Sequence, residues 1–196
     1  MSHPARPLIL GSTSVYRREL LARLRIPFEA LAPEVDETPH PGEPPAQLAG
    51  RLARAKARAV AAQHPEAIVI GSDQVADLDG EALGKPLTHA VAVQQLQRMS
   101  ARRVTFQTAV AVVCMASGFD RMELAQVHVS FRALTDAGIE AYLLAERPYD
   151  CAGSAKSEGL GIALLDSIDS DDPTALVGLP LIRTCRLLRE AGVSLL

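Results

Sequence analysis

The sequence predicts an α/β protein with antiparallel strand pairs in the middle of the chain. Short runs of branched apolar residues, typical of strands, alternate with segments in which apolar residues recur at helical spacing. With 196 residues, of which 48% are apolar, the chain can bury one sizeable core. Because no repeat, low-complexity segment or long linker divides it, we expect a single domain over residues 1–196.

The first half is expected to begin with a strand, a small polar turn and a helix. The turn GSTS (residues 11–14) separates a strand at 7–10 from a helix at 15–24, whose apolar residues form one stripe. Pro44 and Pro45 suit the first turn of a long helix that continues to about Gln63. The other expected elements are strands at 27–32 and 67–70, a hairpin with Asp79-Gly80 as its turn, and a helix from Thr88 to Met99.

The second half is expected to contain two long strands, at about 104–115 and 122–134, joined by a Ser-Gly turn. A segment rich in small residues, CAGSAKSEG (151–159), is irregular. The remaining expected elements are a helix near 136–145, a strand at 162–165 and a helix at about 180–191 stopped by Gly192.

Charge and hydropathy exclude several classes of protein. The net charge of −3 argues against binding a nucleic acid polymer, since such proteins show a clear basic excess. The longest apolar run, Ala109 to Ala116, is too short for a membrane span, and the N-terminal MSHPARP lacks the apolar core of a signal peptide. The three scattered cysteines (Cys114, Cys151 and Cys185) form no CxxC pair and suit a reducing compartment. We therefore expect a cytoplasmic protein.

The segment IVIGSDQV (68–75) places a carboxylate, Asp73, at the expected end of a buried strand. A buried carboxylate without a partner costs on the order of several kcal/mol. Asp73 is therefore a candidate functional residue.

The first helix begins with an arrangement that suits an anion. A helix N-terminus carries partial positive charge, so basic residues are unfavourable there, yet Arg17 and Arg18 occupy the first turn. An anion bound by Ser12, the backbone amides and an arginine would resolve this conflict. The alternative is that both arginines are solvated. Because neither GxxxxGK[ST] nor GxGxxG is present, the sequence indicates neither a P-loop nor a dinucleotide fold.

Three further features suit a metal–phosphate site. The loop PEVDE (33–37) carries three carboxylates, the ligand type that Mg²⁺ prefers, although acidic loops are commonly only solvated. Lys56 falls inside the apolar arc of the long helix, so its ammonium either reaches out to solvent or points at an anion. Lys85 lies in a rigid Gly-Lys-Pro turn, which can present a cation but is also common on surfaces.

Six separated motifs resemble, in order and spacing, those of the Maf family of nucleotide pyrophosphatases. They are GSTSVYRRELL, PEVDE, RLARAKA, IVIGSDQV, GKPLT and PTALVGLPL, and the similarity runs from about Pro7 to Gly192. The resemblance implies a two-lobed α/β fold, with a central mixed sheet flanked by helices and an active-site cleft between the lobes. It also implies metal-dependent hydrolysis of a nucleoside triphosphate to the monophosphate and diphosphate, with Mg²⁺ or Mn²⁺ as cofactor, and a homodimer. Where the family often has glycine, this chain has Ala101 and Ala109.

The resemblance also implies roles for single residues. Glu37 and Asp73 are the implied metal ligands. The basic residues are expected to stabilise charge on the phosphoryl oxygens and the leaving diphosphate while a base activates water. The matching positions are Asp73 (general base), Ser12 and Arg17 (first phosphate-binding turn), Glu37 (functional acid), and Lys56 and Lys85 (phosphate-binding lysines).

Three positions bear on which base is bound: Tyr16, Gln74 and Glu158. The branch of the family that resembles dTTP/UTP pyrophosphatases has Thr and Gln where this chain has Gln74 and Glu158, which look like the 7-methyl-GTP branch. N7-methylguanine carries positive charge, which favours the aromatic face of Tyr16 and the carboxylate of Glu158. From the residues alone, the alternative is that Tyr16 belongs to the core and Glu158 is a solvated loop acid.

The leading hypothesis is a hydrolase that removes 7-methyl-GTP before polymerases use it, so its partner is a small nucleotide and neither a nucleic acid polymer nor a membrane. The first rival keeps the chemistry and changes the substrate to dTTP, UTP or CTP. The second rival is a nucleotide-binding regulator of cell division. The intact set of Arg17, Lys56, Asp73 and Lys85 argues against a pure binder, which gains nothing from a general base.

Overall fold

The computed structural model describes residues 6–196, so most of the N-terminal segment interpreted above lies outside the described residues. The chain forms a mixed sheet of seven strands in the order β2-β1-β3-β5-β6-β7, with β4 paired to β3. The strands are β1 (Leu8–Gly11), β2 (Glu29–Leu31), β3 (Ile68–Leu78), β4 (Glu81–Leu83), β5 (Arg103–Cys114), β6 (Phe119–Phe131) and β7 (Leu165–Asp169). β1 runs parallel to β2 and β3, and the other pairs are antiparallel.

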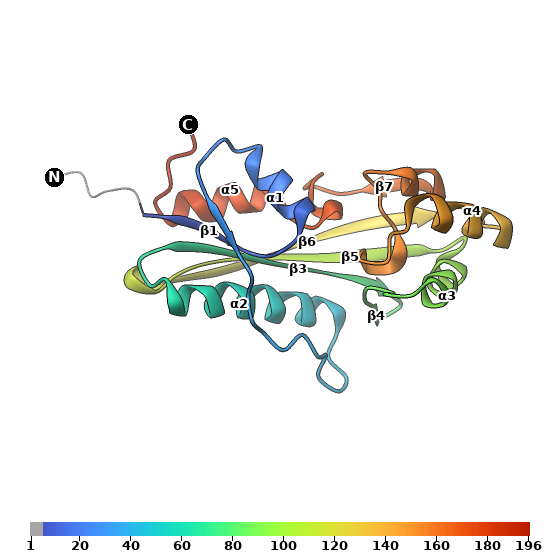
Figure 1. Ribbon diagram of the computed structural model, residues 1–196, viewed down its shortest axis with the longest axis horizontal. Coiled ribbons are helices and arrows are strands. Elements are labelled where there is room, and N and C mark those ends of the chain that lie inside the picture. The colour runs from blue at the N-terminus through green and yellow to red at the C-terminus, as the bar shows by residue number, and fades with distance from the viewer. Residues whose placement is uncertain (1–5) are drawn as a thin grey trace.

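Helices cover both faces of this sheet, as Figure 1 shows: α2 lies on one face, and α1 and α5 lie on the opposite face. α3 and α4 lie toward the far end of the long strands. The helices are α1 (Val15–Ala22), α2 (Pro45–Gln63), α3 (His89–Met99), α4 (Asp136–Glu146) and α5 (Leu181–Glu190). The predicted α/β class, with a mixed sheet flanked by helices, is confirmed. Within residues 6–196, none of the helices combines the length and apolar character needed to cross a bilayer.

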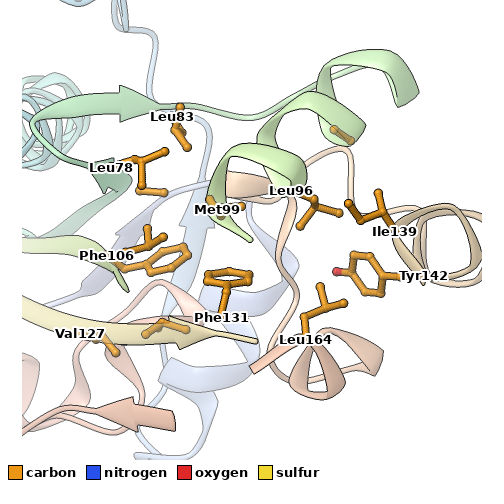
Figure 2. Close-up of a cluster of buried hydrophobic side chains, with 14 of the residues drawn as sticks. Leu78, Leu83, Leu96, Met99, Phe106, Val127, Phe131, Ile139, Tyr142 and Leu164 are labelled. Atoms are coloured by element: carbon orange, nitrogen blue, oxygen red, sulfur yellow. The ribbon is translucent and has the colours of Figure 1, made fainter. Parts of the chain in front are cut away.

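The buried side chains form three clusters along the sheet. One lies between α2 and the sheet, and a second between the sheet and the pair α1 and α5. The third lies at the far end, under α3 and α4. Figure 2 shows this third cluster, which joins Phe106 and Phe131 of the sheet with Leu96 of α3 and Tyr142 of α4.

Close contact between α2 and β3 fixes the part of the sheet on which the site is built. A Cβ atom added at Gly71 would lie 2.2 Å from the carbonyl oxygen of Ala53 and 2.5 Å from the amide nitrogen of Ala57. Glycine at this position therefore lets the helix backbone approach the strand. Since alternate strand residues face the same side, Asp73 faces α2, as Gly71 does.

The structure corrects three predicted boundaries. The strand expected at 67–70 continues through the first arm of the hairpin to Leu78, because the residues between them pair with β5. The strand expected at 162–165 is wrong: residues 160–164 form 3-10 turns and β7 follows them. The first helix ends at Ala22 rather than residue 24, and Arg25 adopts a left-handed φ of 55°.

The predicted hairpin turn and one predicted helix cap are confirmed. Asp79 and Gly80 both have positive φ, as a two-residue hairpin turn requires, and Thr88 caps α3. Ala101, which stands where the family often has glycine, adopts a left-handed φ of 56°. The backbone at this position therefore has the left-handed conformation that favours glycine, although the residue is an alanine.

Candidate active site

The candidate site lies on the stretch of β3 between the end of its pairing with β1 and the start of its pairing with β4. β1 pairs with β3 only as far as Gly71, and β4 begins to pair with it at Ala76. Residues 72–75 therefore have a sheet partner, β5, on one side only. We call residues 72–75 the open edge of β3. Asp73 lies on this edge in the middle of an 11-residue strand, so its predicted position at a strand end is wrong.

A network of two carboxylates and one ammonium group forms at the open edge. The Nζ atom of Lys56 lies 2.7 Å from Oδ1 of Asp73 and 2.9 Å from Oε1 of Glu37. Lys56 and Asp73 are only 5% and 7% exposed, whereas the side chain of Glu37 is 54% exposed. Lys56 therefore points inward at anions, which answers the alternative that it reaches out to solvent. The structure thus supplies a partner for the Asp73 carboxylate.

Arg17 approaches the same edge from the opposite face of the sheet. Its Nε donates a hydrogen bond of 2.8 Å to the carbonyl oxygen of Gly178, which also accepts a hydrogen bond from the Ser72 hydroxyl. Burial lowers the pKa of Arg17, and the negative charges of Asp73 and Glu37 oppose that shift. Arg17 is therefore held in place beside the site. The alternative, that both arginines are solvated, is therefore wrong for Arg17, while Arg18 is exposed.

The GSTS turn brings Ser12 to the end of β1, beside the open edge. The Ser12 side chain is buried, and its hydroxyl accepts a hydrogen bond from the amide of Ser14. Ser14 in turn caps α1 by accepting a hydrogen bond from the amide of Arg17. These bonds fix the turn that joins Ser12 to Arg17.

Gln74 is bound to the loop that carries the motif PTALVGLPL. Its side-chain amide nitrogen lies 2.9 Å from the carbonyl oxygens of Ala175 and Leu176 and 3.0 Å from the Thr108 hydroxyl, and its two hydrogens are shared among these three acceptors. Gln74 therefore joins the open edge to the short turn η4 (Ala175–Val177). Its expected role in base selection stays a prediction.

Tyr16 lies beside the segment 151–159. The Nζ atom of Lys156 lies over its ring, 5.7 Å from the centroid, and Tyr16 belongs to none of the three core clusters. Burial, with the nearby Cys151, Asp150 and Glu158, raises the pKa of Tyr16 to about 12, so the phenol stays neutral. The Glu158 carboxylate is exposed. The structure therefore brings Tyr16 and Glu158 into one neighbourhood, as base recognition by both requires.

Lys85 is the least constrained of the expected phosphate-binding residues. Its side chain is exposed, and within residues 6–196 it forms no ion pair. The preceding residue is anchored, because the carbonyl oxygen of Gly84 accepts hydrogen bonds from Gln95 and from the amide of Gly153. Lys85 thus projects from a fixed point next to the segment 151–159.

The oxygen ligands at the site fit a hard divalent cation. Asp73 and Glu37 are carboxylates, and Mg²⁺ is commonly bound by one or two carboxylates, with waters and substrate phosphates completing its shell. Among the described residues, no three His, Cys, Asp or Glu side chains are grouped for a metal ion. A metal at this site would therefore depend on substrate oxygens for much of its coordination.

Sequence reasoning missed the contribution of backbone carbonyls and of a second ion pair. The Gly178 carbonyl joins Arg17 to Ser72, and only the motif PTALVGLPL hinted that this loop belongs to the site. An ion pair of 2.7 Å joins Lys156 to Glu146 beside Tyr16. No spacing in the sequence indicates that pair, since it depends on how α4 meets the segment 151–159.

The chain is similar to known proteins over nearly its whole length. The family model described as "Maf-like protein" matches residues 7–191. A protein of Albidiferax ferrireducens named 7-methyl-GTP pyrophosphatase is 72% identical, with 100% of this chain and 99% of the relative covered. Relatives of the same name from Polaromonas sp. (70% identity; 97% and 87% covered) and Cupriavidus metallidurans (58%; 98% and 97%) are also similar. The chain therefore belongs to the Maf-like protein family.

Proposed function

We propose that this protein hydrolyses 7-methyl-GTP to 7-methyl-GMP and diphosphate, and so keeps the modified nucleotide from polymerases. The observation that carries the proposal is the full-length identity of 72% with a protein named 7-methyl-GTP pyrophosphatase. The network of Asp73, Lys56 and Glu37 at the open edge supports it, because it supplies a base and charge for phosphoryl chemistry. In this proposal the open edge lies at the floor of a cleft between two lobes.

Asp73 is the general base in this mechanism. Its Oδ1 atom is bound to Lys56, while no residue within 6–196 donates a hydrogen bond to Oδ2. Oδ2 can therefore take a proton from a water molecule whose oxygen bonds to the α-phosphorus. The bond from the α-phosphorus to the bridging oxygen then breaks, and diphosphate leaves with the bonding electron pair. Lys56 holds the Asp73 carboxylate in place through the 2.7 Å bond to Oδ1.

The basic groups receive the charge that develops on the phosphates. Lys56 has three N–H donors, of which two face Asp73 and Glu37, so one remains for a phosphoryl oxygen. Arg17 and Lys85, with Ser12 in the turn, would bind the remaining phosphate oxygens. Mg²⁺ or Mn²⁺, when held by Asp73 and Glu37, supplies further positive charge at the phosphoryl oxygens.

The 7-methylguanine base would lie against Glu158 and against the face of the Tyr16 ring that Lys156 leaves open. A cationic base favours an aromatic face and a carboxylate, and Glu158 has acceptors for the N1 and N2 hydrogens of guanine. Gln74 would act from the edge of the strand through the loop that it holds. The family resemblance supports a homodimer, and the three scattered cysteines suit the cytoplasm.

The test is diphosphate release with Mg²⁺ from 7-methyl-GTP, GTP, dTTP, UTP and CTP, with Asp73→Asn as the matched variant. We expect a strong preference for 7-methyl-GTP and a loss of about 10²-fold or more in Asp73→Asn. Preference for a pyrimidine nucleotide would show that the assigned substrate is wrong, while the proposed reaction would still hold. Nucleotide binding without diphosphate release would show that the proposed enzymatic activity is wrong and would favour a nucleotide-binding regulator of cell division.

A further inference from the structure

The turn that carries Glu158 is tied down on both sides of that residue by one carboxylate. Oε1 of Glu146, at the end of α4, accepts a bond of 2.7 Å from the Lys156 ammonium. Oε2 of the same residue accepts a bond of 2.8 Å from the amide of Leu160. Lys156 and Leu160 stand two residues before and two residues after Glu158. Glu146 therefore fixes the turn at both ends, and Glu158 lies exposed between them.

The backbone of this turn is shaped around the Glu146 carboxylate. A Cβ atom added at Gly159 would lie 2.7 Å from a Glu146 oxygen, and one added at Gly161 would lie 2.4 Å from the carbonyl oxygen of Lys156. The amide of Lys156 is anchored separately, by a hydrogen bond to the Tyr142 hydroxyl. The turn therefore depends on the lack of a side chain at Gly159 and Gly161 and on the Glu146 carboxylate as hydrogen-bond acceptor.

The same ion pair decides which carboxylate the Lys156 ammonium pairs with. Lys156 is only two residues from Glu158, so a free ammonium there could neutralise the Glu158 carboxylate. Bound to Glu146, the ammonium lies over the Tyr16 ring instead, and Glu158 forms no ion pair within residues 6–196. The hydrogen bond between the partners lowers the pKa of Glu146 and raises that of Lys156, so both stay charged near neutral pH. The Glu158 carboxylate thus has no ion-pair partner within residues 6–196 and is available to a cationic base.

We propose that Glu146 is a positioning residue for base selection: it holds the 156–160 turn and keeps the Lys156 ammonium from pairing with Glu158. This inference rests on the proposed function, in which Glu158 contacts the methylated base. Glu146 itself touches neither the substrate nor the reacting atoms in this scheme. Its removal should therefore weaken discrimination between 7-methyl-GTP and GTP more than it slows the chemistry at Asp73.

The experiment compares kcat and KM for 7-methyl-GTP and GTP in four variants. In Glu146→Ala, we expect the ratio of kcat/KM values to fall about tenfold, mainly through KM for 7-methyl-GTP. Glu146→Gln keeps one carbonyl acceptor in place of two, so it should fold and lose selectivity by a smaller factor. Glu123→Ala is the matched control: Glu123 is also a partly buried, ion-paired carboxylate, but its partners are Arg183 and Arg186. It should leave the ratio unchanged.

Glu158→Gln separates failure of this inference from failure of the proposed base contact. If Glu158→Gln lowers the selectivity ratio while Glu146→Ala and Glu146→Gln do not, the positioning role of Glu146 is wrong. If Glu158→Gln leaves the ratio unchanged, the proposed contact of Glu158 with the base is wrong, and the inference fails with it. An equal loss of selectivity in Glu123→Ala would show a general structural effect and would also overturn the inference.

Discussion

Lys56 is the residue on which the electrostatics of the site depend. It is 5% exposed and stands between a buried carboxylate and an exposed one. Removing one member of a buried ion pair leaves the other charge without compensation, and this costs more than the pair itself contributes. Lys85, with the same proposed role toward phosphate, is exposed and unpaired within residues 6–196. The two lysines therefore allow catalysis and stability to be tested separately.

We expect Lys56→Met to lower both the activity and the free energy of unfolding. Activity should fall about 10²-fold or more, because a donor to the phosphoryl oxygens is lost. The free energy of unfolding should fall by about 3 kcal/mol, because Asp73 stays buried without its ammonium partner. Diphosphate release and urea unfolding measure the two effects.

Lys85→Met is the control for that prediction. It should lower activity and leave the free energy of unfolding within about 0.5 kcal/mol of the wild-type value, as is usual for exposed positions. Wild-type stability in Lys56→Met would contradict the structural role of the buried pair.

At the scale of single residues, the sequence predicted which residues are candidates for the site better than it predicted their contacts. The position of Lys56 on the apolar arc of α2 left two directions open for its ammonium, toward solvent or toward an anion, and the structure shows the second. The partners of Arg17 and Gln74 could not be predicted, because both side chains donate to backbone carbonyls of residues 175–178. Every residue has such a carbonyl, so only the tertiary fold decides which ones reach the site.

At the scale of elements, the pairing of α2 with β3 sets the distance from Lys56 to Asp73. The small residues Gly71 and Ser72 interrupt an apolar run, and the predicted strand therefore ended before them. In the structure both residues lie inside the strand. Gly71 allows the backbone of α2 to approach closely, and the Ser72 hydroxyl is within hydrogen-bonding distance of the carbonyl oxygens of Ala109 and Gly178. Residue types that suggest a strand end can thus mark a close approach inside a longer strand.

We expect Gly71→Ala to push α2 away from β3. The added methyl group would meet backbone atoms of Ala53 and Ala57, which cannot rotate aside. The free energy of unfolding should fall by about 1–3 kcal/mol, and activity should fall as Lys56 moves away from Asp73. Gly84→Ala is the control, since an added Cβ there meets no atom within 4 Å. Equal stability of the two variants would mean that the contact between α2 and β3 is not as close as described.

At the scale of the whole molecule, the long strands join the three clusters. β3 contributes Val69 to the cluster under α2, Ile70 to the cluster under α1 and α5, and Leu78 to the far cluster. β5 also contributes to all three. The site lies on β3 between the near clusters and the far one, so its geometry depends on both parts being folded. The α/β class and most elements could be predicted from periodicity, but this sharing of strands could not.

We therefore expect the two parts to unfold together. Cys114, 1% exposed in the cluster under α1 and α5, reports on one part through thiol labelling in denaturant. Tyr142, in the far cluster, contributes to the near-ultraviolet circular dichroism of the other part, with no tryptophan to obscure it. The two probes should give the same midpoint and slope, as a two-state transition requires. If Cys114 became reactive at a clearly lower denaturant concentration than the loss of the tyrosine signal, the near part would unfold by itself. The expected single domain over residues 1–196 would then be wrong, and the open edge of β3 would be a boundary between two independent units.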